Sequence, residues 1–152
     1  MSNSSRLFLA ALVVSASLPL ADAAELGVVA KSPDLVPNAQ RMKNGTVSVR
    51  NKGTADAGPF VITVECNVQG GTGGCAEAPG MAKYEDAAYP NKVVVKVNSL
   101  AAGKTFNHKL SFWKDLDWST GNYQFDVVAD AASDVAETNE GNNSDSYVMT
   151  VP

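Results

Sequence analysis

The sequence predicts an all-β fold, an antiparallel sandwich of about seven strands. Short runs in which apolar and polar residues alternate recur along the chain, as expected of strands with one face in a core. Clusters of glycine, proline and asparagine separate these runs, and no amphipathic helical period interrupts them. Many short strands without helices indicate two sheets packed face to face.

The alternating runs give the expected strands in order. The two prolines of the first run forbid a helix, so this run suits an edge strand. In the third run Phe60, Ile62, Val64 and Cys66 share one face. The expected strands are Pro33–Pro37, Thr46–Arg50, Phe60–Asn67, Lys92–Asn98, Thr105–Trp113, Tyr123–Ala129 and Tyr147–Val151.

Residues 1–23 have the pattern of a secretory signal peptide. Arg6 precedes a short apolar run from Leu7 to Leu20, and residues 21–23 read A-D-A, the small-x-small form of a cleavage site. The apolar run is short for a membrane span, and no later stretch could cross a bilayer. We therefore expect a periplasmic or secreted mature chain, residues 24–152, that folds as a single domain.

The charge of the chain argues against nucleic acid as a partner. Cleavage would remove Arg6 and Asp22 together, so the mature chain keeps the formal net charge of −4. A nucleic-acid backbone requires patches of lysine and arginine, which a mildly acidic chain does not favour.

The two cysteines, Cys66 and Cys75, are expected to form a disulfide. Export brings the chain into an oxidising compartment, where a cysteine pair is typically oxidised. The loop that they would close is short, so the chain-entropy argument gives a stabilisation of about 2.5 kcal/mol. The alternative is a pair of free thiols.

The long segment Gly70–Asn91 shows neither a helical nor a strand period and is expected to be a loop. Long loops in compact domains are usually either functional or disordered. Four aromatic residues in and beyond this segment are candidates for exposed, partner-binding rings, because aromatic side chains often anchor sugar or protein partners. They are Tyr84, Tyr89, Trp113 and Trp118, and their alternative role is packing within the sandwich.

The acidic stretch Asp130–Asn143 is too polar for a core and reads as a long turn between the last two strands. It could bind Ca²⁺, which takes six to eight oxygen ligands. The candidate ligands are Asp130, Asp134, Glu137, Glu140 and Asn142. Their spacing does not match an EF-hand loop, so we expect a turn held by side-chain hydrogen bonds, in which Gly141 takes a left-handed conformation.

The sequence shows no recognisable pattern of catalytic residues. His108 is the single histidine and lies on an otherwise apolar face, where a hydrogen-bonded position at the rim of the core is expected. The glycines of residues 70–74 are not followed by the lysine and hydroxyl of a phosphate-binding loop. Scattered carboxylates leave a glycosidase pair open, because such a pair depends on spatial separation.

Four pieces of the sequence together resemble the CARDB family, the cell-adhesion-related domains found in bacteria. The pieces are N-K-G-T-A-D-A-G-P-F from Asn51, S-L-A-A-G-K-T from Ser99, G-N-Y-Q-F-D-V-V-A-D from Gly121 and V-A-E-T-N-E-G-N-N from Val135. The last piece is the most specific, and together they span nearly the whole mature chain. The resemblance implies an immunoglobulin-like sandwich that binds or presents and does not catalyse. In such a sandwich, Tyr123 would bury its ring and bond its hydroxyl to nearby backbone, as in a tyrosine corner.

The leading functional hypothesis is an exported binding module of the bacterial envelope, which holds a protein or glycan partner through the Gly70–Asn91 loop. The alternative is a structural spacer without a ligand of its own. A calcium-binding domain and an enzyme are weaker hypotheses, because neither a calcium-loop spacing nor a catalytic constellation is legible.

Overall fold

The computed structural model describes residues 30–69, 75 and 77–152. The expected signal peptide, residues 1–23, lies outside the described residues. Within the described part of the chain, no helix is long and apolar enough to cross a membrane.

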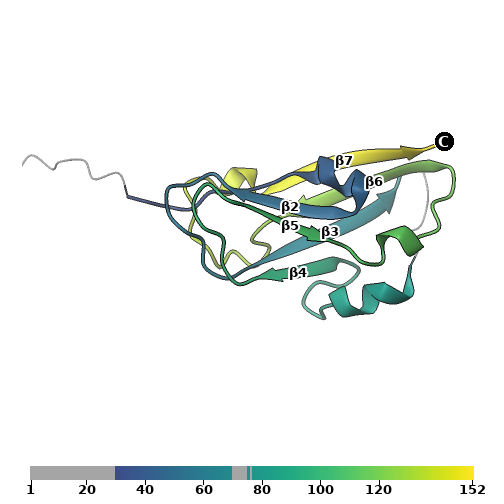
Figure 1. Cartoon of the computed structure of the whole chain (residues 1–152), viewed down its shortest axis with the longest axis horizontal. Helices are drawn as coiled ribbons and strands as arrows, with labels where there is room; N and C mark the ends of the chain where they lie inside the picture. Colours follow the sequence, from purple (N-terminus) through teal and green to yellow (C-terminus); the bar gives the residue numbers. More distant parts are fainter. Residues whose placement is uncertain (1–29, 70–74, 76) are drawn as a thin grey trace, which may run out of the picture.

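The described chain forms two antiparallel sheets, which confirms the predicted all-β sandwich (Figure 1). One sheet has three strands in the order β1-β2-β5, and the other has four strands in the order β4-β3-β6-β7. The three-stranded sheet comprises β1 (Leu35–Pro37), β2 (Thr46–Asn51) and β5 (Thr105–Lys109). The four-stranded sheet comprises β4 (Val93–Val97), β3 (Phe60–Val68), β6 (Gly121–Val128) and β7 (Ser144–Val151).

Four short 3-10 helices join the strands. They are η1 (Ala39–Asn44), η2 (Pro79–Tyr84), η3 (Trp113–Asp115) and η4 (Glu140–Asn142). Figure 1 places η2 and η3 at the end of the sandwich where the C-terminus lies. The turn between β6 and β7 lies at the opposite end, close to the first described residues (Figure 1). The acidic turn and the η2 segment, which are the two regions expected to carry a function, therefore lie at opposite ends of the domain.

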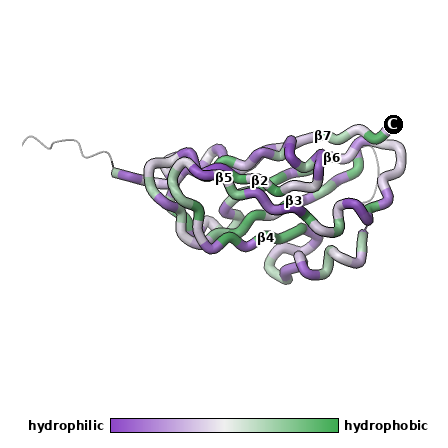
Figure 2. Tube along the Cα trace, in the orientation of Figure 1, coloured by the Kyte–Doolittle hydropathy of each residue, from purple (hydrophilic) through white to green (hydrophobic). Residues whose placement is uncertain are grey.

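The core lies between the sheets and follows the alternation of the strands. The pairing of β3 with β6 places Val64 opposite Val127 and Cys66 opposite Phe125. These four side chains therefore lie on the same face of the sheet, the face that meets the core. A shift of one residue would turn these side chains to solvent, so burial of this face fixes the register. Figure 2 shows β4 as largely hydrophobic, as expected of a strand whose inward face meets this core.

Two segments fold differently from the expectation. The run expected as a strand from Thr105 to Trp113 leaves the sheet after Lys109, where the chain turns into η3. Leu110 and Phe112 remain only 2% exposed, so the apolar alternation continues although the backbone no longer pairs. The Gly70–Asn91 segment contains η2, a helix of six residues that begins with Pro79, and it is too short to show a period.

The predicted disulfide between Cys66 and Cys75 is present, with the two Cα atoms 5.7 Å apart. Cys66 lies near the end of β3, and Cys75 precedes η2. The bond therefore anchors the start of the η2 segment to the longest strand of the four-stranded sheet.

The predicted anchor role of Tyr123 is confirmed. Its ring is buried at the start of β6, and its hydroxyl donates a hydrogen bond of 2.8 Å to the backbone carbonyl of Ser119. The ring also packs edge-on against Trp118, with centroids 4.8 Å apart. Tyr123 thus ties the β5–β6 connection to the strand that follows it.

We expect Tyr123→Phe to lower the free energy of unfolding by about 1 kcal/mol, the usual net value of one hydrogen bond. The ring packing stays in place, so the loss reports the hydroxyl alone. Tyr147→Phe is the matched control, because the Tyr147 hydroxyl makes no hydrogen bond within the described chain. Urea unfolding of both variants measures the difference, and equal midpoints would contradict the tyrosine corner.

Candidate functional site

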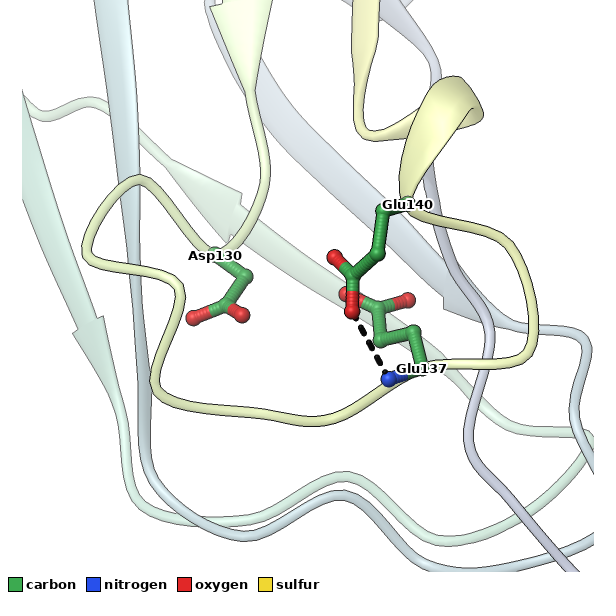
Figure 3. Close-up of side chains that lie close together, drawn as sticks. All are labelled: Asp130, Glu137 and Glu140. Atoms are coloured by element: carbon green, nitrogen blue, oxygen red, sulfur yellow. Dashed lines mark hydrogen bonds between the residues drawn. The ribbon is translucent and has the colours of Figure 1, made fainter.

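The turn between β6 and β7 gathers three carboxylates at one point (Figure 3). Asp130, Glu137 and Glu140 each bring one oxygen into a group whose members all lie within 4.8 Å of one another. Asp130 is buried, Glu137 is half-buried and Glu140 is exposed. These three carboxylates are close enough to share one cation.

Backbone amides already hold Asp130. Its two carboxylate oxygens accept hydrogen bonds of 3.0 Å from the backbone N–H groups of Asp134 and Val135. The backbone of Asp130 is in the left-handed region with φ 48°, a conformation that aspartate tolerates better than most residues. The buried carboxylate therefore closes the first half of the turn.

The other two carboxylates are held in the same way. Glu137 accepts from the backbone N–H of Leu35 and, at 3.0 Å, from the side-chain amide of Asn143. Glu140 accepts at 2.9 Å from the backbone N–H of Glu137 and at 3.2 Å from the Asn143 amide. All six carboxylate oxygens of the cluster thus accept hydrogen bonds, which supports the expected turn held by side chains.

The turn also fastens the edge strand β1 to the rest of the sandwich. The Leu35–Glu137 bond crosses from β1 to the turn, and the Asn142 amide donates at 2.9 Å to the carboxylate of Asp34. The backbone N–H of Thr138 donates at 2.9 Å to the carbonyl of Pro33. These contacts give the polar turn a structural role that does not require a ligand.

Two expectations for this turn need correction. Asp134 is exposed and does not belong to the carboxylate cluster, so the structure does not bring together all the candidate calcium ligands. Gly141 is not left-handed; it lies in η4, while Asp130 and Ser133 take the positive φ values instead. The turn changes direction early, next to the buried carboxylate, and not at its glycine.

Burial raises the pKa of the Glu137 carboxyl, and the nearby charge of Glu140 adds to this effect. The hydrogen bond from the Leu35 backbone opposes the shift without cancelling it. A raised pKa means that the folded state binds a proton more readily than the unfolded chain. The contribution of Glu137 to stability is therefore full below its ordinary pKa near 4.5 and is lost as the pH rises through the folded pKa.

We expect Glu137→Gln to gain stability relative to the wild type as the pH rises from 4 to 7, because the variant carries no charge to desolvate. The new amide oxygen can still accept from the Leu35 backbone. Glu85→Gln, an exposed position at the other end of the domain, is the control. Urea unfolding at both pH values measures the effect, and parallel pH profiles for wild type and Glu137→Gln would contradict it.

We also expect millimolar Ca²⁺ to leave the unfolding temperature nearly unchanged, because the cluster's oxygens already have N–H partners. A dedicated site at one hundred times its Kd would add about 2.7 kcal/mol, a shift of several degrees. Thermal unfolding with Ca²⁺ and with chelator measures this. A shift of several degrees would overturn the structural interpretation and make Asp130, Glu137 and Glu140 metal ligands.

The second candidate site is a cleft of about 1260 Å³ at the opposite end of the domain. One wall is formed by Cys75 and by residues within 77–93, and the other comprises the end of β3, part of β6 and the β5–β6 connection. The strands β3 and β6 have nine and eight residues, whereas β2 and β5 have six and five. The inner face of the longer sheet is therefore available to form the cleft.

The structure places three of the four candidate aromatic residues at this cleft. Tyr89, Trp113 and Trp118 all line it and are partly exposed. The two tryptophan rings pack against each other with centroids 4.9 Å apart, and both contact Phe125 of β6. The two tryptophan side chains therefore pack against the core and also expose part of their rings to the cleft.

The expectation of an exposed ring at Tyr84 was wrong. Tyr84 is only 7% exposed, and its ring packs edge-on against Phe112 with centroids 5.4 Å apart. Its hydroxyl lies 3.0 Å from Nε2 of His108 in a hydrogen bond, as the expected rim position of His108 requires. Tyr84 is the anchor that holds η2 against the sandwich.

Two ion pairs hold the segment that follows η2. Lys92 pairs with Glu65 at 3.2 Å, and Lys96 pairs with Asp86 at 2.9 Å. The hydrogen bond from Lys96 holds the pKa of the Asp86 carboxyl below its ordinary value, and the same pair raises the pKa of Lys96. These pairs fix the segment after η2 along β4 and the adjoining end of β3.

The two antiparallel sheets, the tyrosine corner and the apolar interior define an immunoglobulin-like β-sandwich domain. The CARDB family model matches residues 23–146, and the chain therefore belongs to the CARDB family. CARDB domains are generally non-catalytic, adhesion-related modules of cell surfaces. No curated protein matches the sequence.

Two solved structures are similar to this chain. A CARDB domain from Pyrococcus furiosus, solved in complex with di-metal ions, is 18% identical, with a TM-score of 0.43 over 78% of this chain and 93% of that one. A domain from Methanosarcina acetivorans, described as part of a cell surface protein, is 22% identical, with a TM-score of 0.47 over 80% of this chain and 93% of that one.

Proposed function

We propose that this chain is an exported, non-catalytic binding module that holds a partner of the cell envelope in the cleft beside η2. The observation that carries the proposal is the cleft itself, a concave surface with partly exposed aromatic rings at Tyr89, Trp113 and Trp118. Aromatic rings over apolar side chains are the usual anchors of protein recognition sites. Membership of an adhesion-related family supports the same proposal.

The architecture supports a fixed recognition surface. The disulfide holds one end of the η2 segment, and Tyr84 holds the middle against Phe112 and His108. The Lys96–Asp86 pair holds the part that follows. A wall fixed at three points loses little conformational entropy when a partner binds.

The test is capture of envelope proteins and glycans by the exported chain and by two variants. Tyr89→Ala removes a partly exposed ring from the cleft, and Val148→Ala removes an exposed apolar side chain from β7, outside the lining of the cleft. We expect the same partner to be captured by the wild type and by Val148→Ala, and to be lost with Tyr89→Ala.

Two outcomes would overturn the proposal. Capture that is equal for both variants would place the recognition surface elsewhere on the domain. Capture of no partner by the folded wild type would favour a structural spacer of the envelope. Circular dichroism of each variant establishes that the fold is retained before capture is compared.

A further inference from the structure

The cleft beside η2 combines two chemistries at different depths. Its accessible apolar lining comes from partly exposed side chains, among them Met81, Val93, Trp113 and Trp118. These side chains offer a ligand a largely apolar contact surface. The depth of the cleft therefore favours bulky apolar groups.

The lining of the cleft is acidic. It contains the four carboxylates of Glu65, Glu77, Glu85 and Asp86 against the single ammonium of Lys92. Glu77 and Glu85 are exposed, and neither belongs to an ion pair within the described chain. Their negative charge is thus available to a ligand, and it repels an anionic one.

We infer that the cleft takes a basic, apolar peptide segment of a partner protein, in which bulky apolar side chains enter the depth and lysine or arginine side chains meet Glu77 and Glu85. This inference rests on the proposed function and names the class of ligand. Long basic side chains suit such a rim, because their apolar stems can follow the wall while their charged ends stay in water.

A glycan fits the same surface less well. Sugar hydroxyls that entered the cleft would lose water without finding hydrogen-bond partners on side chains such as Met81 and Val93, which costs binding free energy. The cleft volume of about 1260 Å³ also exceeds the range of roughly 300–1,000 Å³ that is usual for small-molecule sites. A peptide segment with several side chains uses both the volume and the charge.

The test uses synthetic probes and fluorescence anisotropy at physiological ionic strength. Short labelled peptides share the same leucine and phenylalanine residues and differ only in their remaining positions, which are lysine, serine or glutamate. We expect the lysine peptide to bind the exported chain about tenfold more tightly than the serine peptide, and the glutamate peptide to bind most weakly. Unlabelled cellohexaose serves as the neutral glycan probe.

Protein variants place the effect in the cleft. Glu85→Lys should weaken the lysine peptide by about tenfold and strengthen the glutamate peptide. Asp134→Lys makes the same charge change at an exposed position at the far end of the domain and should leave both affinities unchanged within about twofold. Both substitutions are at exposed positions, so neither disturbs the core.

Equal affinity for the three peptides, no binding of any peptide, or equal effects of Glu85→Lys and Asp134→Lys would each overturn the inference. Displacement of the envelope partner by cellohexaose, with no effect of the lysine peptide, would also overturn it. Capture of an envelope partner that depends on Tyr89 would still uphold the proposed function in every one of these cases. The experiments therefore distinguish a wrong ligand class from a wrong recognition surface.

Discussion

Replacing Asn51 with alanine is expected to destabilise the domain by about 3 kcal/mol or more. The Asn51 side chain is fully buried and makes four hydrogen bonds. Its oxygen accepts from the backbone N–H groups of Asp34 and Gly53 at 3.1 and 3.0 Å. Its amide donates to the carbonyls of Ala55 and Leu100 at 2.8 and 2.9 Å.

The cost is large because Asn51→Ala leaves several backbone groups without a partner. A buried polar group that loses its partner costs about 1 to 3 kcal/mol, more than the net value of the hydrogen bond itself. The side chain also joins three segments, the start of β1, the loop after β2 and the β4–β5 turn. Its loss therefore loosens that end of the sandwich as a whole.

Asn107→Ala is the matched control, because Asn107 is an exposed residue of β5 in the same sheet. We expect it to change the free energy of unfolding by no more than about 0.5 kcal/mol. Urea unfolding of both variants at neutral pH gives the comparison. An Asn51→Ala midpoint equal to that of Asn107→Ala would show that water replaces the four hydrogen bonds.

The role of Asn51 could not be predicted from the sequence. In the chain it opens the loop segment N-K-G-T-A-D-A-G-P-F, where asparagine is a common turn residue. Its partners Asp34 and Leu100 lie 17 and 49 positions away. Local pattern reveals a turn, whereas a hydrogen-bond hub depends on which distant segments the fold brings together.

The strands were predictable because their alternation is local. Each run of alternating residues indicates which face of the strand meets the core, and the pairing of β3 with β6 agrees with this pattern. The same signal was misleading at Leu110 and Phe112, which are buried by a turn and η3 and not by a strand. Burial was predicted correctly there, and backbone pairing was not.

The cleft was only partly predictable. The sequence indicated a functional segment at Gly70–Asn91 and named the aromatic candidates, and three of these rings line the cleft. Its apolar lining draws on η1, η2, β4, η3 and β6, through Met42, Met81, Val93, Trp113 and Phe125, which are widely separated in the chain. Tyr84 was misjudged because its burial depends on contacts with His108 and Phe112 that no local pattern shows.

Replacing Gly45 with alanine is expected to destabilise the domain by about 3 kcal/mol and to disturb the cleft. Gly45 ends η1 with φ 63°, a left-handed conformation that costs a residue with a Cβ about 1 to 2 kcal/mol. An alanine Cβ would also come within 2.5 Å of three atoms of Trp113. Such overpacking typically costs a further 1 to 3 kcal/mol.

Trp113 cannot easily move away from this new methyl group. Its ring packs against Trp118 at 4.9 Å and against Phe125 at 5.3 Å between centroids. A displaced Trp113 would alter the surface of the cleft, so the indole signals should report the change. We expect altered near-ultraviolet circular dichroism together with weaker capture of the partner proposed above.

Gly103→Ala separates the two causes. Gly103 is also left-handed, with φ 73°, but a Cβ there would meet no atom within 4 Å. This variant should therefore lower the free energy of unfolding only by the cost of its backbone conformation, about 1 kcal/mol, and should leave the tryptophan signals unchanged. Urea unfolding and near-ultraviolet spectra of both variants give the comparison. Equal midpoints and equal spectra would mean that the contact between Gly45 and Trp113 does not constrain the cleft.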